Sequence, residues 1–102
     1  LLAALEFAAG GDAEALVARP RFHHQYLPDQ IQHEPNALTP EVQERLRAMG
    51  HELKDIGRRY GDMQVVLWDC RRNQVQAASD PRGIGAARTL AVRAAPRQAA
   101  CR

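Results

Sequence analysis

The sequence has few aromatic residues, only two cysteines and no long apolar run. Phe, Trp and Tyr make up 5% of its 102 residues, and alanine supplies much of the 45% that is hydrophobic. A chain of this size buries about two-thirds of the surface that it exposes when unfolded, so its core must be small. We therefore expect a single domain that is marginally stable or depends on a partner.

The two cysteines, Cys70 and Cys101, are too few for a disulfide framework and lack C-x-x-C spacing. We predict two free thiols, with a chance disulfide or an intermolecular crosslink as the alternative. The apolar opening at residues 1–5 is far shorter than the roughly 20 residues that cross a bilayer, and it has no basic flank of a signal peptide. It also has no capping residue, so we expect Leu1 to continue a longer helix.

Acidic residues are absent from residues 83–102, which contain four arginines. The formal net charge of +2 and the pI of about 8.9 are therefore properties of this segment. Arginines this far apart, with no aromatic side chain among them for base stacking, are weak evidence for nucleic-acid binding. We predict that 83–102 is a disordered Arg/Ala-rich tail, and that the chain binds neither nucleic acid nor membrane.

Helix signals occur in three places. Apolar residues at helical spacing predict two pieces, at 1–9 and 13–17, separated by Gly10-Gly11. A helix start is strongly predicted at Thr39-Pro40-Glu41. The Thr39 hydroxyl can cap the helix, Pro40 has the φ angle that the first helical residue requires, and the Glu41 carboxylate lies in the first turn, near the positive end of the helix dipole. We expect that helix to reach Met49, with Gly50 at its left-handed terminus.

Strand signals lie between and after these helices. Residues from Phe22 onward, 30–34 and 51–56 are predicted to be extended, with a turn at Pro28-Asp29. Residues 63–68 and 74–78 predict an antiparallel hairpin. The continuous apolar run in 63–68 predicts burial on both faces of that strand.

Four segments carry the most specific pattern in the chain. They are Arg19-Pro20-Arg21-Phe22-His23-His24-Gln25-Tyr26-Leu27-Pro28-Asp29, Leu38-Thr39-Pro40 with Gly50-His51, Gly61-Asp62-Met63-Gln64, and Ala78-Ser79-Asp80-Pro81-Arg82. In these motifs and their order the chain resembles gamma-glutamyltransferases, over about residues 5–82. The similar part is the C-terminal portion of that enzyme's small subunit.

The resemblance implies an α/β (α+β) fold: a piece of the αββα sandwich of N-terminal nucleophile hydrolases, with two or three helices and a small, mainly antiparallel sheet. It also implies transfer or hydrolysis of the gamma-glutamyl groups of glutathione and related amides. In the family the threonine nucleophile, the glutamate-binding residues and the oxyanion glycines all precede this segment, and Gly10-Gly11 is not that glycine pair. We therefore expect no catalytic residue and no cofactor site here, and no activity from the chain alone.

The expected partners follow from the same resemblance. They are the large subunit and the N-terminal part of the small subunit, and the isolated chain is expected to form a homo-oligomer. If it follows the bacterial family, the protein is periplasmic or secreted. The alternative is a free-standing, non-catalytic domain that acts through self-association or protein binding.

Six residues are singled out as structural: Arg21, Phe22, His23, His24, Asp80 and Arg82. Consecutive residues of an extended segment point to opposite faces, so the paired histidines are expected to make hydrogen bonds and no metal site. Asp80-Pro81 sets a turn, and Arg82 offers a rigid fork to carboxylates or carbonyls. Arg21 offers the same fork, and both arginines could pin loops around a nearby active site.

Overall fold

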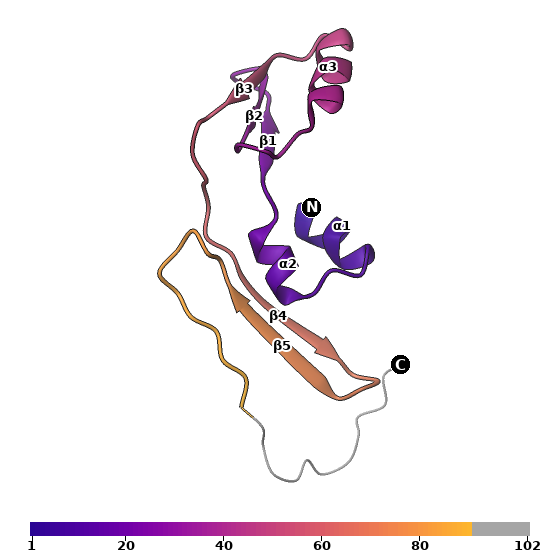
Figure 1. Cartoon of the computed structure of the whole chain (residues 1–102), viewed down its shortest axis with the longest axis vertical. Coiled ribbons are helices and arrows are strands. Elements are labelled where there is room, and N and C mark those ends of the chain that lie inside the picture. Colours follow the sequence, from indigo (N-terminus) through magenta and orange to yellow (C-terminus); the bar gives the residue numbers. More distant parts are fainter. Residues whose placement is uncertain (91–102) are drawn as a thin grey trace. The chain divides into compact units, whose positions relative to one another are not determined.

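The computed structural model describes residues 1–90. These residues form helices α1 (Leu2–Ala8), α2 (Ala13–Ala18) and α3 (Pro40–Ala48), and strands β1 (Phe22–Gln25), β2 (Gln30–His33), β3 (Leu53–Asp55), β4 (Gln64–Asp69) and β5 (Gln74–Ser79) (Figure 1). Few helices with small, mainly antiparallel sheets confirm the predicted fold class.

The chain divides into two compact units where the sequence suggested one domain. The hairpin unit consists of Leu1–Ala18 together with the chain from Asp62 onward, and the insert unit is Arg19–Gly61. The insert unit therefore interrupts the hairpin unit in sequence. Each unit has its own sheet.

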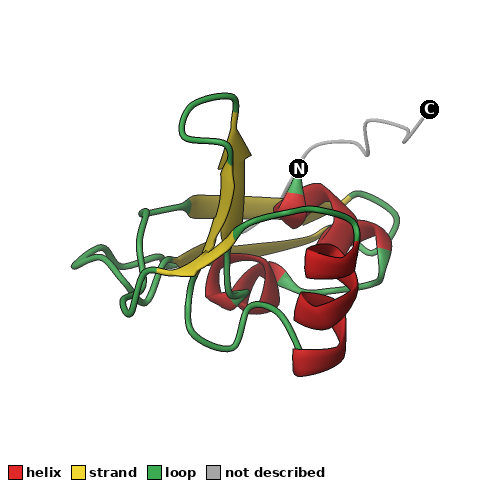
Figure 2. Cartoon of the chain, turned by 90° about the horizontal axis from the view of Figure 1, so that it is seen from above, coloured by secondary structure: helices red, strands yellow, loops and turns green. Residues whose placement is uncertain are grey.

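The hairpin unit is built on β4 and β5, which pair antiparallel along their whole length as predicted (Figure 1). Figure 2 shows the helices of the chain in red and its strands in yellow. Helix α2 begins where Asp12 caps it, because Asp12 Oδ1 accepts the backbone N–H of Ala15 at 2.8 Å. The small core consists of Ala13 and Val17 from α2 and Ala78 from β5, with three apolar residues packed around them: Met63 just before β4, and Val65 and Leu67 within it.

Strand β4 is covered on one face only, so the prediction of burial on both faces is wrong. Val66 and Trp68 lie on the face opposite α2 and are 71% and 61% exposed. Their neighbour Val75 on β5 is 49% exposed. The apolar run arises because both faces of β4 carry apolar residues, while α2 reaches only one of them within the described chain. We call the uncovered part of the other the open face; its residues are Val66, Trp68, Val75 and Ala77. At the end of this face Gly85 lies against the side chains of Ser79 and Gln64.

The insert unit holds a three-stranded sheet in the order β1-β2-β3, in which β1 is antiparallel and β3 is parallel to β2. Helix α3 joins β2 to β3 and begins as predicted: Thr39 Oγ1 accepts the N–H of Val42 at 3.3 Å, and Pro40 is the first helical residue. The helix ends at Ala48, and Gly50 just beyond it has a left-handed φ of 92°. The exposed Glu41 carboxylate accepts hydrogen bonds from its own N–H and from the Thr39 hydroxyl, which lowers its pKa.

Cys70 follows β4 and is disulfide-bonded, so the prediction of a free thiol is wrong for this residue. Cysteine spacing gave no signal, because pairing depends on the distance between Cβ atoms in the folded chain. Residues 83–90 contain no helix or strand. Cys101 and the rest of the predicted tail from residue 91 lie outside the described residues. No described helix has the length and apolar character that crossing a membrane requires.

Candidate functional site

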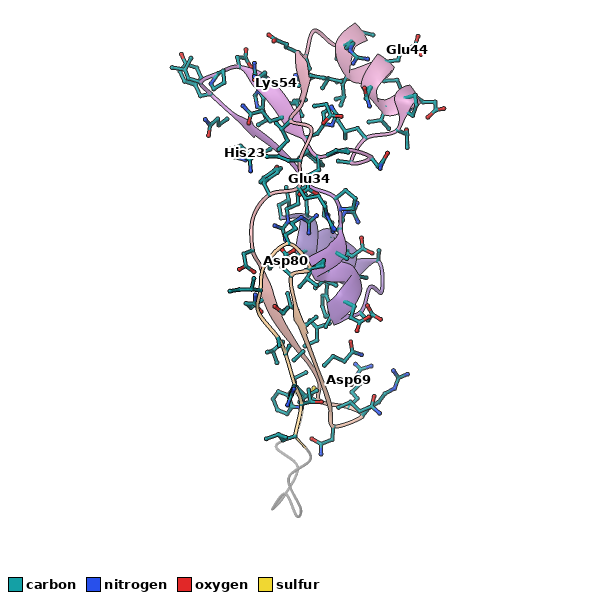
Figure 3. The ribbon with its side chains drawn as sticks, turned by 60° about the vertical axis from the view of Figure 1, so that its left-hand side comes forward. His23, Glu34, Glu44, Lys54, Asp69 and Asp80 are labelled. Atoms are coloured by element: carbon teal, nitrogen blue, oxygen red, sulfur yellow. The ribbon has the colours of Figure 1, made fainter. Side chains whose placement is uncertain are left out.

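A buried carboxylate closes the insert unit. Glu34 directly follows β2 and is 1% exposed. Its Oε2 accepts the backbone N–H of Arg21 at 3.1 Å, and its Oε1 accepts the backbone N–H of Tyr60 at 2.7 Å. Because Arg21 lies at the start of the unit and Tyr60 at its end, one side chain ties the two together (Figure 3).

Arg21 strengthens the same closure. Its Nη1 donates to the carbonyl oxygen of Tyr60 at 2.7 Å, and its own carbonyl accepts the N–H of Glu34 at 2.8 Å. The guanidinium passes close to Gly61, where a Cβ would collide with Nη1. We call Arg21, Glu34 and Tyr60 the Glu34 latch.

A second buried carboxylate organises the hairpin unit. Asp80 is 1% exposed and follows β5. Its Oδ2 accepts the backbone N–H of Met63 at 3.0 Å, and its own N–H donates to the Met63 carbonyl at 3.0 Å. Its Oδ1 accepts both the backbone N–H and Nη1 of Arg82, each at 3.0 Å. The carboxylate thereby joins the residue before β4 to the turn after β5.

Arg82 extends this contact to α2. Its Nη1 donates to the carbonyl of Val17 at 2.8 Å and its Nη2 to that of Ala18 at 3.5 Å. These are the last two residues of α2, and terminal helix carbonyls have no partner within their own helix. The Arg82 and Asp80 side chains are 3% and 0% exposed. We call Asp80 and Arg82, with the main-chain groups they hold, the Asp80 latch (Figure 3).

Sequence reasoning singled out Arg21, Asp80 and Arg82 but missed Glu34. The groups that Glu34 binds lie 13 and 26 positions away in the chain. A single acid after a polar strand therefore gives no local signal of its role. The only hint is its position directly before Pro35, where the strand must end.

The paired histidines lie on β1 and make separate contacts. His23 Nε2 is 3.1 Å from Gln25 Oε1, and His24 Nε2 is 2.8 Å from Asp29 Oδ1. The His24 ring also meets His51 edge to face, with centroids 6.2 Å apart. Among the described residues, no three His, Cys, Asp or Glu side chains gather where they could hold a metal ion. The absence of a metal site stays a prediction.

Phe22 completes the motif at the start of β1, where it is 42% exposed and pairs in register with His33. His33 is buried, with Nδ1 3.0 Å from the carbonyl oxygen of Glu34. Arg21 of the motif therefore belongs to the Glu34 latch, and Phe22 follows it opposite His33, the residue before Glu34. The chemistry that these contacts supply is hydrogen bonding and charge pairing to the main chain, which holds loops in place.

Comparisons with known proteins point to one family. The model of the family described as gamma-glutamyltranspeptidase matches residues 3–90. The glutathione hydrolase proenzyme of Pseudomonas aeruginosa is 45% identical over 74 residues, which are 71% of this chain and 13% of that protein. The present chain therefore spans a small part of that relative's length.

Solved structures agree with this match. The gamma-glutamyltranspeptidase of Pseudomonas nitroreducens complexed with L-DON gives a TM-score of 0.72 at 34% identity, over 88% of this chain and 47% of that one. The Bacillus anthracis transpeptidase enzyme CapD gives 0.70 at 22% identity, over 87% and 54%, and shows the same fold. This chain thus covers about half of each solved chain.

Proposed function

The chain belongs to the gamma-glutamyltranspeptidase family, and on this premise we propose that it is a scaffold portion of an enzyme that transfers or hydrolyses the gamma-glutamyl groups of glutathione and related amides. It corresponds to the C-terminal part of the small subunit, supplies no nucleophile and is inactive alone. One observation carries this proposal: the buried carboxylates Glu34 and Asp80 and both motif arginines bind main-chain groups of their own unit.

The threonines of the chain also support a scaffold role. A threonine nucleophile needs a base, which in N-terminal nucleophile enzymes is the residue's own α-amine. Threonine occurs here at Thr39 and Thr89, whose nitrogens are non-basic amides unless the chain is cleaved directly before them. The Thr39 hydroxyl caps α3 by accepting the N–H of Val42.

The pure chain is expected to release no detectable chromophore from a gamma-glutamyl anilide, because it lacks both a nucleophile with its base and an oxyanion hole. The control is a complete gamma-glutamyltranspeptidase assayed in parallel. Turnover that persists through purification and disappears in Thr39→Ala or Thr89→Ala would disprove the proposal.

We also propose that the rest of the enzyme covers the open face. In an αββα sandwich each sheet is covered by helices on one side and by the second sheet on the other, and α2 already supplies the helical side. The open face contains no charged residue, which suits sheet-on-sheet packing across about 10 Å. Each large apolar side chain that becomes buried there contributes about 1.5 to 3 kcal/mol.

Trp68 is the only tryptophan of the chain and reports on this face. In the isolated chain, acrylamide should quench its fluorescence strongly, because the side chain is 61% exposed. When the chain is co-expressed and purified with the rest of the enzyme, the emission should shift to the blue and quenching should fall. Unchanged quenching in that complex would contradict the proposal. Protection already present in the isolated chain, with a dimer by light scattering, would favour self-association instead.

We propose a periplasmic or extracellular location. The disulfide at Cys70 supports it, because disulfides persist in oxidising compartments and are rare in the cytosol.

A further inference from the structure

We propose that residues 85–90, which we call the edge segment, pair with β5 as a third, antiparallel strand of the hairpin unit. In the structure this segment contains no strand and returns along β5 after the turn at 81–84 (Figure 1). Strand β5 and the edge segment belong to the same unit. The pairing is therefore a local closure within that unit, and it does not depend on the proposed activity.

Strand β5 has an unpaired outer edge in the described chain. Asp80 directly follows β5, and its N–H donates to the Met63 carbonyl at 3.0 Å, so it points to the β4 side. Main-chain groups of successive strand residues point to alternate sides, so those of Val75, Ala77 and Ser79 point away from β4. Within residues 1–90, β5 pairs only with β4, and no main-chain hydrogen bond joins these three residues to another segment. The outer edge of β5 can therefore take a further strand.

The edge segment lies along this outer edge in the antiparallel direction. A Cβ added to Gly85 would collide with Ser79 Oγ, so Gly85 packs directly on Ser79. Ala87 lines a cavity of about 370 Å³ with α2 and the last residues of β5, and Thr89 lines one of about 440 Å³ with the first half of β5. As the residue number rises along the edge segment, the number of its neighbour on β5 falls. This order defines three pairs, which are Gly85–Ser79, Ala87–Ala77 and Thr89–Val75.

This register matches the hydrogen-bonding groups of the outer edge. Its three β5 residues are the same three whose N–H and C=O groups point away from β4. Each pair can therefore exchange two main-chain hydrogen bonds, as alternate pairs of an antiparallel ladder do. Residues 85–90 make no main-chain hydrogen bond within the described chain. Closure thus gives partners to main-chain groups on both segments.

The side chains of the edge segment suit the same register. Alternation places Ala86, Arg88 and Leu90 on the face of the sheet that packs against α2. Arg88 then lies opposite Gln76 and near the acidic Glu14 of α2, which lines both cavities. Leu90 is 88% exposed in the structure, and closure brings it to the core side of the sheet. One register therefore places an apolar side chain on the core side and an arginine beside a carboxylate.

Proline substitution tests the pairing, because proline removes one main-chain N–H. Ala87→Pro removes an N–H that points to β5 in the proposed register. Ala86→Pro is the matched control, because the N–H at that position points to solvent, where an edge strand tolerates proline. Hydrogen exchange of the full chain, read residue by residue by nuclear magnetic resonance, should show the Ala77 amide protected in the unchanged chain. Ala87→Pro should lower that protection about tenfold or more, and Ala86→Pro should change it by less than about threefold.

Equal effects of the two prolines on the Ala77 amide would overturn the proposal, as would an Ala77 amide that exchanges freely in the unchanged chain. Protection that rises with protein concentration would also overturn it, because a second copy would then occupy the edge. A nuclear Overhauser effect between the Hα atoms of Ala78 and Ala86 needs no variant. These residues face each other as a non-hydrogen-bonded pair, with Cα atoms about 4.5 Å apart. The effect is expected, and its absence at low protein concentration would disprove the pairing even if Ala87→Pro does not fold.

Discussion

An Asp80→Ala variant is expected to lose about 3 to 5 kcal/mol of the free energy of unfolding, because it removes the buried carboxylate that pairs with the Arg82 guanidinium. The Arg82 side chain is 3% exposed. The substitution also leaves the N–H of Met63 without its acceptor. Such a loss is a large fraction of a small domain's total stability. Urea unfolding followed by Trp68 fluorescence measures it, since this tryptophan lies on β4.

A double-mutant cycle separates the charge pair from the other contacts of Asp80. Replacing Arg82 by methionine as well removes both members of the charge pair, so Asp80→Ala with Arg82→Met should be less destabilised than the sum of the two single variants. The matched control is Asp62→Ala, an exposed aspartate in the same unit, which should cost no more than about 0.5 kcal/mol. Additive single effects would show that the pair is not coupled.

The elements that could be predicted from the sequence are those with local signals. Helix α3 was placed because Thr39, Pro40 and Gly50 act within a turn of their own positions. The β4–β5 hairpin was placed because two strand-forming runs flank a short polar loop. In each case the residues that determine the element are neighbours in sequence.

The latches could not be predicted as assemblies, although some of their members drew attention by residue type. Arg82 donates to Val17 from 65 positions away, and nothing near either residue encodes that contact. Glu34 was missed for the same reason. The division into two units depends on which distant segments these side chains join, so it was hidden as well.

The open face shows how tertiary context changes the meaning of a local pattern. An apolar run such as Val65-Val66-Leu67-Trp68 is typical of a strand that is buried on both faces. Within the described chain only Val65 and Leu67 find the core, and Val66 and Trp68 remain exposed. The pattern therefore fits the complete sandwich of the family better than it fits this chain alone.

Gly61→Ala is expected to destabilise the insert unit by about 2 to 4 kcal/mol, through two costs that act together. Gly61 has a φ of 84°, a left-handed conformation that an L-residue adopts at a cost of about 1 to 2 kcal/mol. The new Cβ would also collide with Nη1 of Arg21. The guanidinium must then move, which weakens its hydrogen bond to the Tyr60 carbonyl.

Comparison with Gly57→Ala separates the backbone cost from the cost of the collision with Arg21. Gly57 also has a positive φ, of 64°, but a Cβ added there would have no atom within 4 Å. Gly57→Ala should show only the backbone cost of about 1 to 2 kcal/mol. Urea unfolding followed by far-ultraviolet circular dichroism, with hydrogen exchange to locate the change, compares the two variants in the same unit. Equal destabilisation would mean that the Arg21 fork adds nothing to the Glu34 latch. A larger loss for Gly61→Ala is the result that the geometry requires.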